Sequence, residues 1–180
     1  CTTSLVAYSI IFRSLFANDG LVNYVLVNLG ILDKPYNFLT QPFAAKMVIL
    51  LGLLWRWTGY NMVFFLSGLQ NIEYSVYEAA KIDGASAIQT FFKITVPLLK
   101  PTILLTAIMS TNGTLQLFDE SVNLTDGGPA NASISMSHYI YNLCFKYVPN
   151  FGYAAAMSFF ILLLVAVLAF IQMRVGDKRD

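Results

Sequence analysis

The chain has 180 residues, of which 57% are hydrophobic and only 12% are charged, and its mean hydropathy is +0.62. A soluble domain usually carries about a quarter charged residues, so this composition excludes a disordered chain and an ordinary water-soluble enzyme. Eleven basic and ten acidic residues leave a net charge of +1, which gives no electrostatic basis for binding nucleic acid. The composition instead indicates an all-α, polytopic transmembrane helical bundle.

Long apolar stretches predict where the chain crosses the membrane, because a helix needs about 20 apolar residues to span the hydrocarbon core. Residues 154–173 contain no charged residue, and 43–69 and 98–118 contain only one or two basic residues each. The apolar run at the start of the chain, about 1–16, is too short for a complete span, and the first residue is not Met. We therefore expect four spans, with the chain beginning inside a transmembrane helix and earlier spans missing.

The distribution of Lys and Arg predicts the orientation, since cytoplasmic connections carry an excess of both. The connection 70–97, extended to Lys100, holds three basic residues, and the C-terminal tail holds three more. Two spans separate this connection from the tail, so both lie on the same side of the membrane. The connections 17–42 and 119–153, with the span edge at Lys46, hold three. We expect the connection 70–97 and the C-terminus to be cytoplasmic.

The connection 70–97 carries strong local signals for two short helices. The runs SVYE at 75–78 and SAIQ at 86–89 each have the spacing of a capping box. In this motif the Ser side chain accepts from the backbone N–H of the Glu or Gln, whose side chain accepts from the backbone N–H of the Ser. Gly84 suits the left-handed residue that ends a helix, and Pro97 is expected to stop the second helix or open the next. We call residues 75–96 the elbow. On physical grounds it is either a docking knob for a partner or a surface loop that only caps itself.

The elbow resembles the EAA motif of ABC importer membrane subunits, E-A-A-x3-G-x9-I-x-L-P. The match runs from Glu78 to Pro97 and departs only at Val96, where Leu is usual. The flanking stretches 65–72 (FLSGLQNI) and 124–129 (LTDGGP) are similar to maltose-permease-like, carbohydrate-type importers, and the resemblance covers essentially the whole chain. In that family the loop is a coupling helix that enters a cleft of the cytoplasmic ATPase. The residues to which the resemblance gives this coupling role are Glu78, Ala79, Ala80, Asp83, Gly84 and Ala85.

The resemblance implies the C-terminal part of an ABC importer transmembrane domain of type I, in the cytoplasmic (inner) membrane of a prokaryote. The solute would be a sugar or a sugar-derived compound. The implied partners are two copies of an ATP-binding subunit, a second homologous permease subunit, an extracytoplasmic solute-binding protein and membrane lipid. The sequence has no nucleophile–base set, paired catalytic carboxylates, Cys/His metal spacing or phosphate-binding loop. We therefore expect no catalytic residue, metal or cofactor in this chain, and ATP hydrolysis by a separate subunit.

Polar residues inside the apolar stretches are candidates for the solute pathway. A central Arg such as Arg56 costs about 2.5–3.5 kcal/mol in a span, so it should face a water-filled cavity, a partner helix or backbone carbonyls. Asn112 and Gln116 have the i, i+4 spacing of one helix face, and unpaired amides avoid lipid. Sugars need amides, hydroxyls and aromatic faces, but hydrogen bonding between helices explains the same residues. The candidates are Arg56, Tyr60, Asn61, Ser110, Asn112 and Gln116.

Two other functions remain open at this point. An ion- or proton-coupled secondary carrier needs acidic residues inside the membrane, and the only acids that touch an expected span are Asp119 and Glu120, at its end. A non-transporting membrane scaffold would leave the polar face of 98–118 unexplained.

Overall fold

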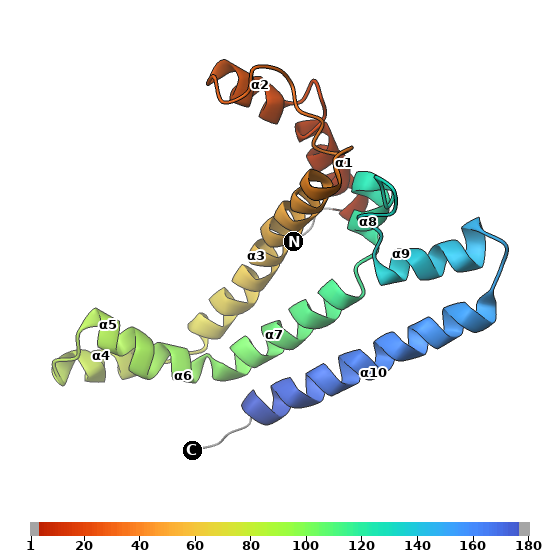
Figure 1. Cartoon of the computed structure of the whole chain (residues 1–180). Coiled ribbons are helices and arrows are strands. Elements are labelled where there is room, and N and C mark those ends of the chain that lie inside the picture. The colour runs from red at the N-terminus through yellow and green to blue at the C-terminus, as the bar shows by residue number, and fades with distance from the viewer. Residues whose placement is uncertain (1–3, 177–180) are drawn as a thin grey trace. The chain divides into compact units, whose positions relative to one another are not determined.

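The computed structural model describes residues 4–176, and all regular structure in that part of the chain is helical, as the composition predicts (Figure 1). Two helices are long and apolar enough to cross a membrane, α3 (Pro42–Gln70) and α10 (Phe151–Gly176). They cover the stretches 43–69 and 154–173. The first apolar run forms α1 (Leu5–Leu15), which has 11 residues and is shorter than a span.

The stretch 98–118, which we expected to be one helix, is interrupted. A helical segment made of α5 (Ala87–Thr90), the π-helix η1 (Phe91–Thr95) and α6 (Val96–Leu98) meets α7 (Lys100–Leu115) at a bend of 64°. In a straight helix the N–H of residue 101 would donate to the carbonyl of residue 97, but residue 101 is proline and has no N–H. The missing bond and the proline ring explain the bend. Only the bent pair together reaches the length and hydropathy of a span.

The chain divides into two compact units. The first comprises the chain up to Arg56 together with Gly113–Leu163. Its helices are α1, α2 (Leu21–Asn28), the first half of α3, α8 (Asp119–Thr125), α9 (Met136–Tyr141), the π-helix η2 (Asn142–Lys146) and the first half of α10. Small residues of α3 let α1 approach closely: Ala45 is fully buried, and a Cβ on Gly52 would touch the rings of Tyr8 and Phe12.

The connection 17–42 of the first unit is held by one buried amide. Asn23, 1% exposed, donates to the carbonyls of Ala17 and Tyr36 at 3.0 and 2.9 Å and accepts from the backbone N–H of Tyr36 at 2.8 Å. These three bonds join the start of the connection to its second half.

The second unit comprises Trp57–Asn112 and the chain from Leu164 on. It contains the second half of α3, the elbow, most of α7 and the second half of α10. Glycine allows close packing here: a Cβ on Gly68 would lie 2.8 Å from Leu99, and one on Gly176 would lie 2.7 Å from Leu104. The Gln172 side chain of α10 donates to the Thr111 hydroxyl of α7 at 2.8 Å.

Candidate functional site: the elbow and the polar groups of the helices

The first arm of the elbow is α4 (Tyr74–Ile82), and it does not begin with the expected capping box. The N-cap residue is Glu73, no side chain caps the helix, and the Ser75 hydroxyl donates to the Glu73 carboxylate at 3.2 Å. The helix begins at Tyr74, so Ser75 already lies inside the first turn and cannot serve as its cap. The prediction of a capping box between Ser75 and Glu78 is therefore wrong.

The end of this arm agrees with the sequence. Gly84 has a φ of +74°, the left-handed conformation expected for it. The Ala85 N–H donates to the carbonyl of Ala80 at 3.0 Å, and the Gly84 N–H donates to that of Lys81 at 3.2 Å. These two bonds form a Schellman motif, which satisfies carbonyls that the helix end would leave without partners.

The second arm begins with the capping box that the sequence predicts. The Gln89 N–H donates to the Ser86 hydroxyl at 3.3 Å, and the Ser86 N–H donates to the Gln89 side chain at 2.9 Å. The arm then widens into η1, and Pro97 lies in the first turn of the short α6. The ring of a proline at 97 crowds the carbonyl of residue 93, which lies within η1, and the wider π turn accommodates this.

The two arms contact each other inside the elbow. The Tyr77 and Thr95 hydroxyls lie 3.3 Å apart, and Thr95 and Ala80 are 7% and 6% exposed. Ala80 thus packs within the elbow and is not part of its outer face. Of the other residues to which we gave a coupling role, Glu78, Ala79, Asp83 and Gly84 are exposed and Ala85 is partly exposed.

The outer face of the elbow carries bare apolar side chains. Ile82 is 85% exposed, Ile88 72% and Phe92 65%. They stand among charged residues such as Lys81 and Asp83. Exposed apolar side chains rimmed by charges are typical of a surface that another protein or a membrane covers.

In the first unit, Arg56 has an acidic partner. Its Nη1 lies 2.5 Å from Oε1 of Glu120, and the Tyr8 hydroxyl donates to the same oxygen at 2.6 Å. Glu120 and Tyr8 are 1% and 2% exposed, whereas the Arg56 side chain is 33% exposed. Sequence patterns did not indicate a role for Tyr8 and placed Glu120 only at the end of a span. The available signal was charge: an Arg inside one span and an acid at the end of another are each costly unless opposite charges meet.

Gln116, also in the first unit, is exposed and lies in the turn that follows α7. Since α7 ends at Leu115, the helical spacing from which we placed Gln116 beside Asn112 does not extend to it.

In the second unit, two pathway candidates bond to each other. Asn61 of α3 donates to the Ser110 hydroxyl of α7 at 3.1 Å, and that hydroxyl lies 3.4 Å from the Asn61 oxygen. Tyr60 packs edge-on against Trp57, with ring centroids 5.6 Å apart. Asn112 of α7 is exposed. The structure therefore gives Asn61 and Ser110 a packing contact, and Asn112 a surface position.

The connection 119–153 contains a buried polar cluster that sequence reasoning also missed. The Ser121 hydroxyl, fully buried, donates to the carbonyl of Ser133 at 2.8 Å and lies 2.9 Å from Nδ1 of His138. Because the hydroxyl proton goes to Ser133, Nδ1 of His138 is the donor in the second bond. A serine oxygen that is buried and bonded in this way is a structural group and not a nucleophile.

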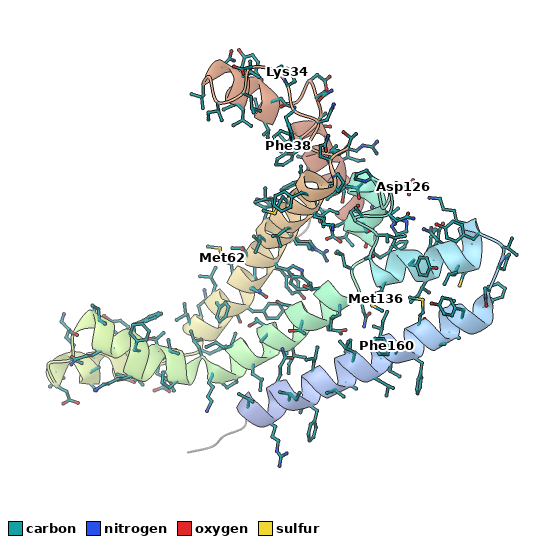
Figure 2. All side chains as sticks on the ribbon, viewed as in Figure 1. Lys34, Phe38, Met62, Asp126, Met136 and Phe160 are labelled. Carbon is teal, nitrogen blue, oxygen red and sulfur yellow. The ribbon has the colours of Figure 1, made fainter. Side chains whose placement is uncertain are left out.

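His138 faces two charged side chains beyond this hydroxyl. Its Nε2 lies 3.9 Å from Asp126, and Lys146 bonds the same carboxylate at 3.0 Å; Figure 2 labels Asp126 at the end of α8. Burial lowers the pKa of His138 from its ordinary value, the Asp126 carboxylate opposes this, and the Lys146 ammonium adds to it. His138 is therefore held neutral.

Comparisons with known proteins agree over nearly the whole chain. Residues 4–179 match the family described as "Binding-protein-dependent transport system inner membrane component". The lactose transport system permease protein LacF of Rhizobium radiobacter is 54% identical over 99% of this chain and 61% of its own length. The trehalose/maltose transport system permease protein MalF of Thermococcus litoralis is 36% identical over 89% of this chain and 53% of its own length. The chain thus spans little more than half the length of these relatives.

The fold is also that of a solved transporter. A chain of a bacterial ABC transporter involved in the import of the acidic polysaccharide alginate superposes with a TM-score of 0.84, at 23% identity, over 97% of this chain and 61% of that one. The likeness establishes the helical fold of an ABC transporter permease. By its match from residue 4 to residue 179 and by its sugar-permease relatives, the chain belongs to the inner membrane components of binding-protein-dependent transport systems.

Proposed function

We propose that this chain is the C-terminal part of a permease subunit that carries a sugar or sugar-derived solute across the cytoplasmic membrane, driven by a separate ATPase. The main support for the proposal is the rigid elbow with an exposed apolar surface, found in a chain that belongs to this family. Its two arms are fixed by a Schellman motif, a capping box and the Tyr77–Thr95 contact, and its outer face is apolar. A rigid knob with bare apolar side chains is suited to entering a cleft on another protein.

The membrane topology follows from the basic residues. The elbow and the C-terminus face the cytoplasm, and the connections 17–42 and 119–153 face outward. The spans are the apolar stretch about 1–16, which contains α1, then α3, the bent segment that ends in α7, and α10. Two ATP-binding subunits, a second permease subunit and a solute-binding protein complete the importer. ATP binding and hydrolysis drive transport by shifting the equilibrium between inward- and outward-facing states.

The contact with the ATPase is formed by residues on the surface of the elbow. These are the exposed Glu78, Ala79, Asp83 and Gly84, the partly exposed Ala85, and the apolar side chain of Ile82. Ala80 contributes from inside, because its small side chain lets the two arms lie close together.

Two substitutions of matched exposure test the docking surface. Ile82 on the elbow is 85% exposed and Val148 on the connection 119–153 is 89% exposed. In the full-length permease, purified with its partners in detergent, Ile82→Asp should release the ATPase, while Val148→Asp should retain it. Retention of the ATPase by both variants, or its loss only from Val148→Asp, contradicts docking at the elbow.

Single-cysteine labelling tests the orientation. In a background without native cysteines, an impermeant thiol reagent should label Ala130→Cys but not Ala87→Cys in intact cells; both positions are exposed. Labelling of Ala87→Cys from outside contradicts the topology. Uptake into proteoliposomes, with lactose as the first solute to test, measures the transport itself.

A further inference from the structure

A groove lies between α7 and α10 in the second unit. Its volume is about 570 Å³, within the range of about 300–1,000 Å³ that is usual for ligand pockets. Three of the side chains that line it, Leu104, Phe170 and Met173, are apolar, and the fourth is the cation Arg174. The groove therefore has an apolar wall and a positive charge at one end.

The two helices that form the groove are packed together. The Gln172 side chain of α10 donates to the Thr111 hydroxyl of α7 at 2.8 Å. A Cβ on Gly176 would lie 2.7 Å from Leu104, so the backbone of α10 lies against that side chain. These two contacts hold α10 on α7 just before and just after the groove residues 173 and 174, and they fix the groove between the helices.

The positions of the lining residues along α10 match the layers of a membrane. At about 1.5 Å per residue, α10 rises about 35 Å from Phe151 to Arg174, slightly more than the hydrocarbon core of about 30 Å. Arg174 therefore reaches the lipid headgroups, and Phe170, about 6 Å deeper, lies among the acyl chains. Phe170 and Met173 are 64% and 57% exposed, so the apolar wall is open to whatever surrounds the helix pair.

We propose that this groove binds an anionic phospholipid, with an acyl chain along the apolar wall and the headgroup phosphate on Arg174. Arg174 forms no ion pair with any residue between 4 and 176. A guanidinium binds a phosphate through two parallel hydrogen bonds, which makes it well suited to this headgroup. A free phosphate would leave the apolar wall uncovered, and a lipid without net charge would leave the guanidinium without an anion. The inference does not depend on which solute the permease carries.

Local fluorescence quenching tests the inference. Val167 is 57% exposed and shares a helix face with Phe170 and Arg174, at spacings of three and seven residues, but it does not line the groove. The full-length permease, assembled with its partners in a background without native cysteines, carries a bimane label on Val167→Cys. It is placed in nanodiscs of phosphatidylcholine with a small fraction of brominated phosphatidylglycerol or brominated phosphatidylcholine. Because bromine quenches only nearby labels, quenching reports which lipid occupies this site.

The wild-type groove should concentrate phosphatidylglycerol over phosphatidylcholine roughly fivefold, the factor expected for one basic residue near an anionic lipid. Arg174→Gln should remove this enrichment, and Arg174→Lys should retain part of it. Arg13→Gln is the matched control, because Arg13 is also exposed in the last turn of an apolar helix but belongs to the first unit. It should leave the enrichment unchanged.

A second variant covers the case in which Arg174→Gln does not insert. Met173→Glu keeps Arg174 and places a carboxylate in the groove, so it should abolish the enrichment as well. Equal quenching by the two lipids in the wild type overturns the proposal, as does an enrichment that survives Arg174→Gln or Met173→Glu. Quenching by neither lipid would show that protein covers the groove and would also overturn it. Since no solute is present, none of these results bears on the proposed transport function.

Discussion

Ala85 donates its backbone N–H to the carbonyl of Ala80 at 3.0 Å, across the left-handed turn at Gly84. This bond closes the first arm of the elbow and sets the direction in which the second arm leaves. Ala80 is also buried, so its backbone carbonyl closes the turn while its side chain is covered. The angle of the elbow therefore depends on the backbone conformation of one glycine.

Substitution of Gly84 should show this dependence. The space around a Cβ at Gly84 is open, so the cost of a side chain is backbone strain alone, about 1–2 kcal/mol for a left-handed residue. Gly84→Val should reduce the stimulation of ATP hydrolysis by the loaded solute-binding protein in proteoliposomes, with normal membrane insertion. Gly84→Asn is the matched control, because Asn adopts the left-handed conformation more readily, and it should retain more of the stimulation. Equal activity of Val and Asn variants would mean that the turn angle does not matter for coupling.

The two serines of the elbow should differ in their effect on its stability. Ser86 makes a reciprocal capping box and Ser75 does not cap its helix. Ser86→Ala should destabilise the second arm by about 1 kcal/mol and speed amide hydrogen exchange in α5 and η1. Ser75→Ala should leave exchange in α4 close to that of the wild type. Similar effects of both substitutions would argue against the difference in capping.

Local sequence signals predicted the local structure of this chain well. The turn at Gly84 and the cap at Ser86 depend on residues within five positions, and the sequence contains both. The helices α3 and α10 follow from apolar length alone. The capping box at Ser75 failed because the helix would have to begin at residue 76 for Ser75 to be its N-cap, and α4 begins two residues earlier, at Tyr74. The helix boundary expected at Pro97 lies two residues from the break at Leu99, but the 64° bend at that break was not predicted.

Local sequence signals could not predict contacts between residues that are far apart in the sequence. Tyr8 and Glu120 are 112 positions apart and Arg56 and Glu120 are 64 apart, so no spacing rule joins them. The cost of a charge in the membrane predicted that Arg56 faces a water-filled cavity, a partner helix or backbone carbonyls, but it could not identify Glu120. The same limit applies to Asn61, which we assigned to the pathway from its polarity and which bonds Ser110.

The buried cluster around His138 should make the connection 119–153 sensitive to acid. Burial holds the pKa of His138 below its ordinary value of 6.5. In acid, His138 therefore binds a proton more tightly in the unfolded connection than in the folded one, which favours unfolding. The stabilisation is complete above about pH 6.5 and is lost as the pH falls below that value toward the folded pKa. Hydrogen exchange in α8 and α9 should therefore be faster at pH 5.5 than at pH 7.5, after correction for the intrinsic rates. In His138→Gln, which does not titrate, this difference should be smaller; an unchanged difference would assign the effect to another group.

Asn112 and Asn61 allow packing and transport to be separated. Asn61 bonds Ser110 on the neighbouring helix, and Asn112 is an exposed residue of α7. Asn61→Leu breaks a hydrogen bond between two helices, which is worth about 0.6 kcal/mol on average in membrane proteins, so it should lower the thermal stability of the purified complex. Asn112→Leu should retain the ATPase but reduce solute uptake into proteoliposomes, because Asn112 is proposed to border the solute route and leucine cannot bond sugar hydroxyls. Gln116→Leu, at the second exposed amide, should act as Asn112→Leu does. Undiminished uptake by both, or loss of the complex in either, would show that these amides hold subunits together and do not border the solute route.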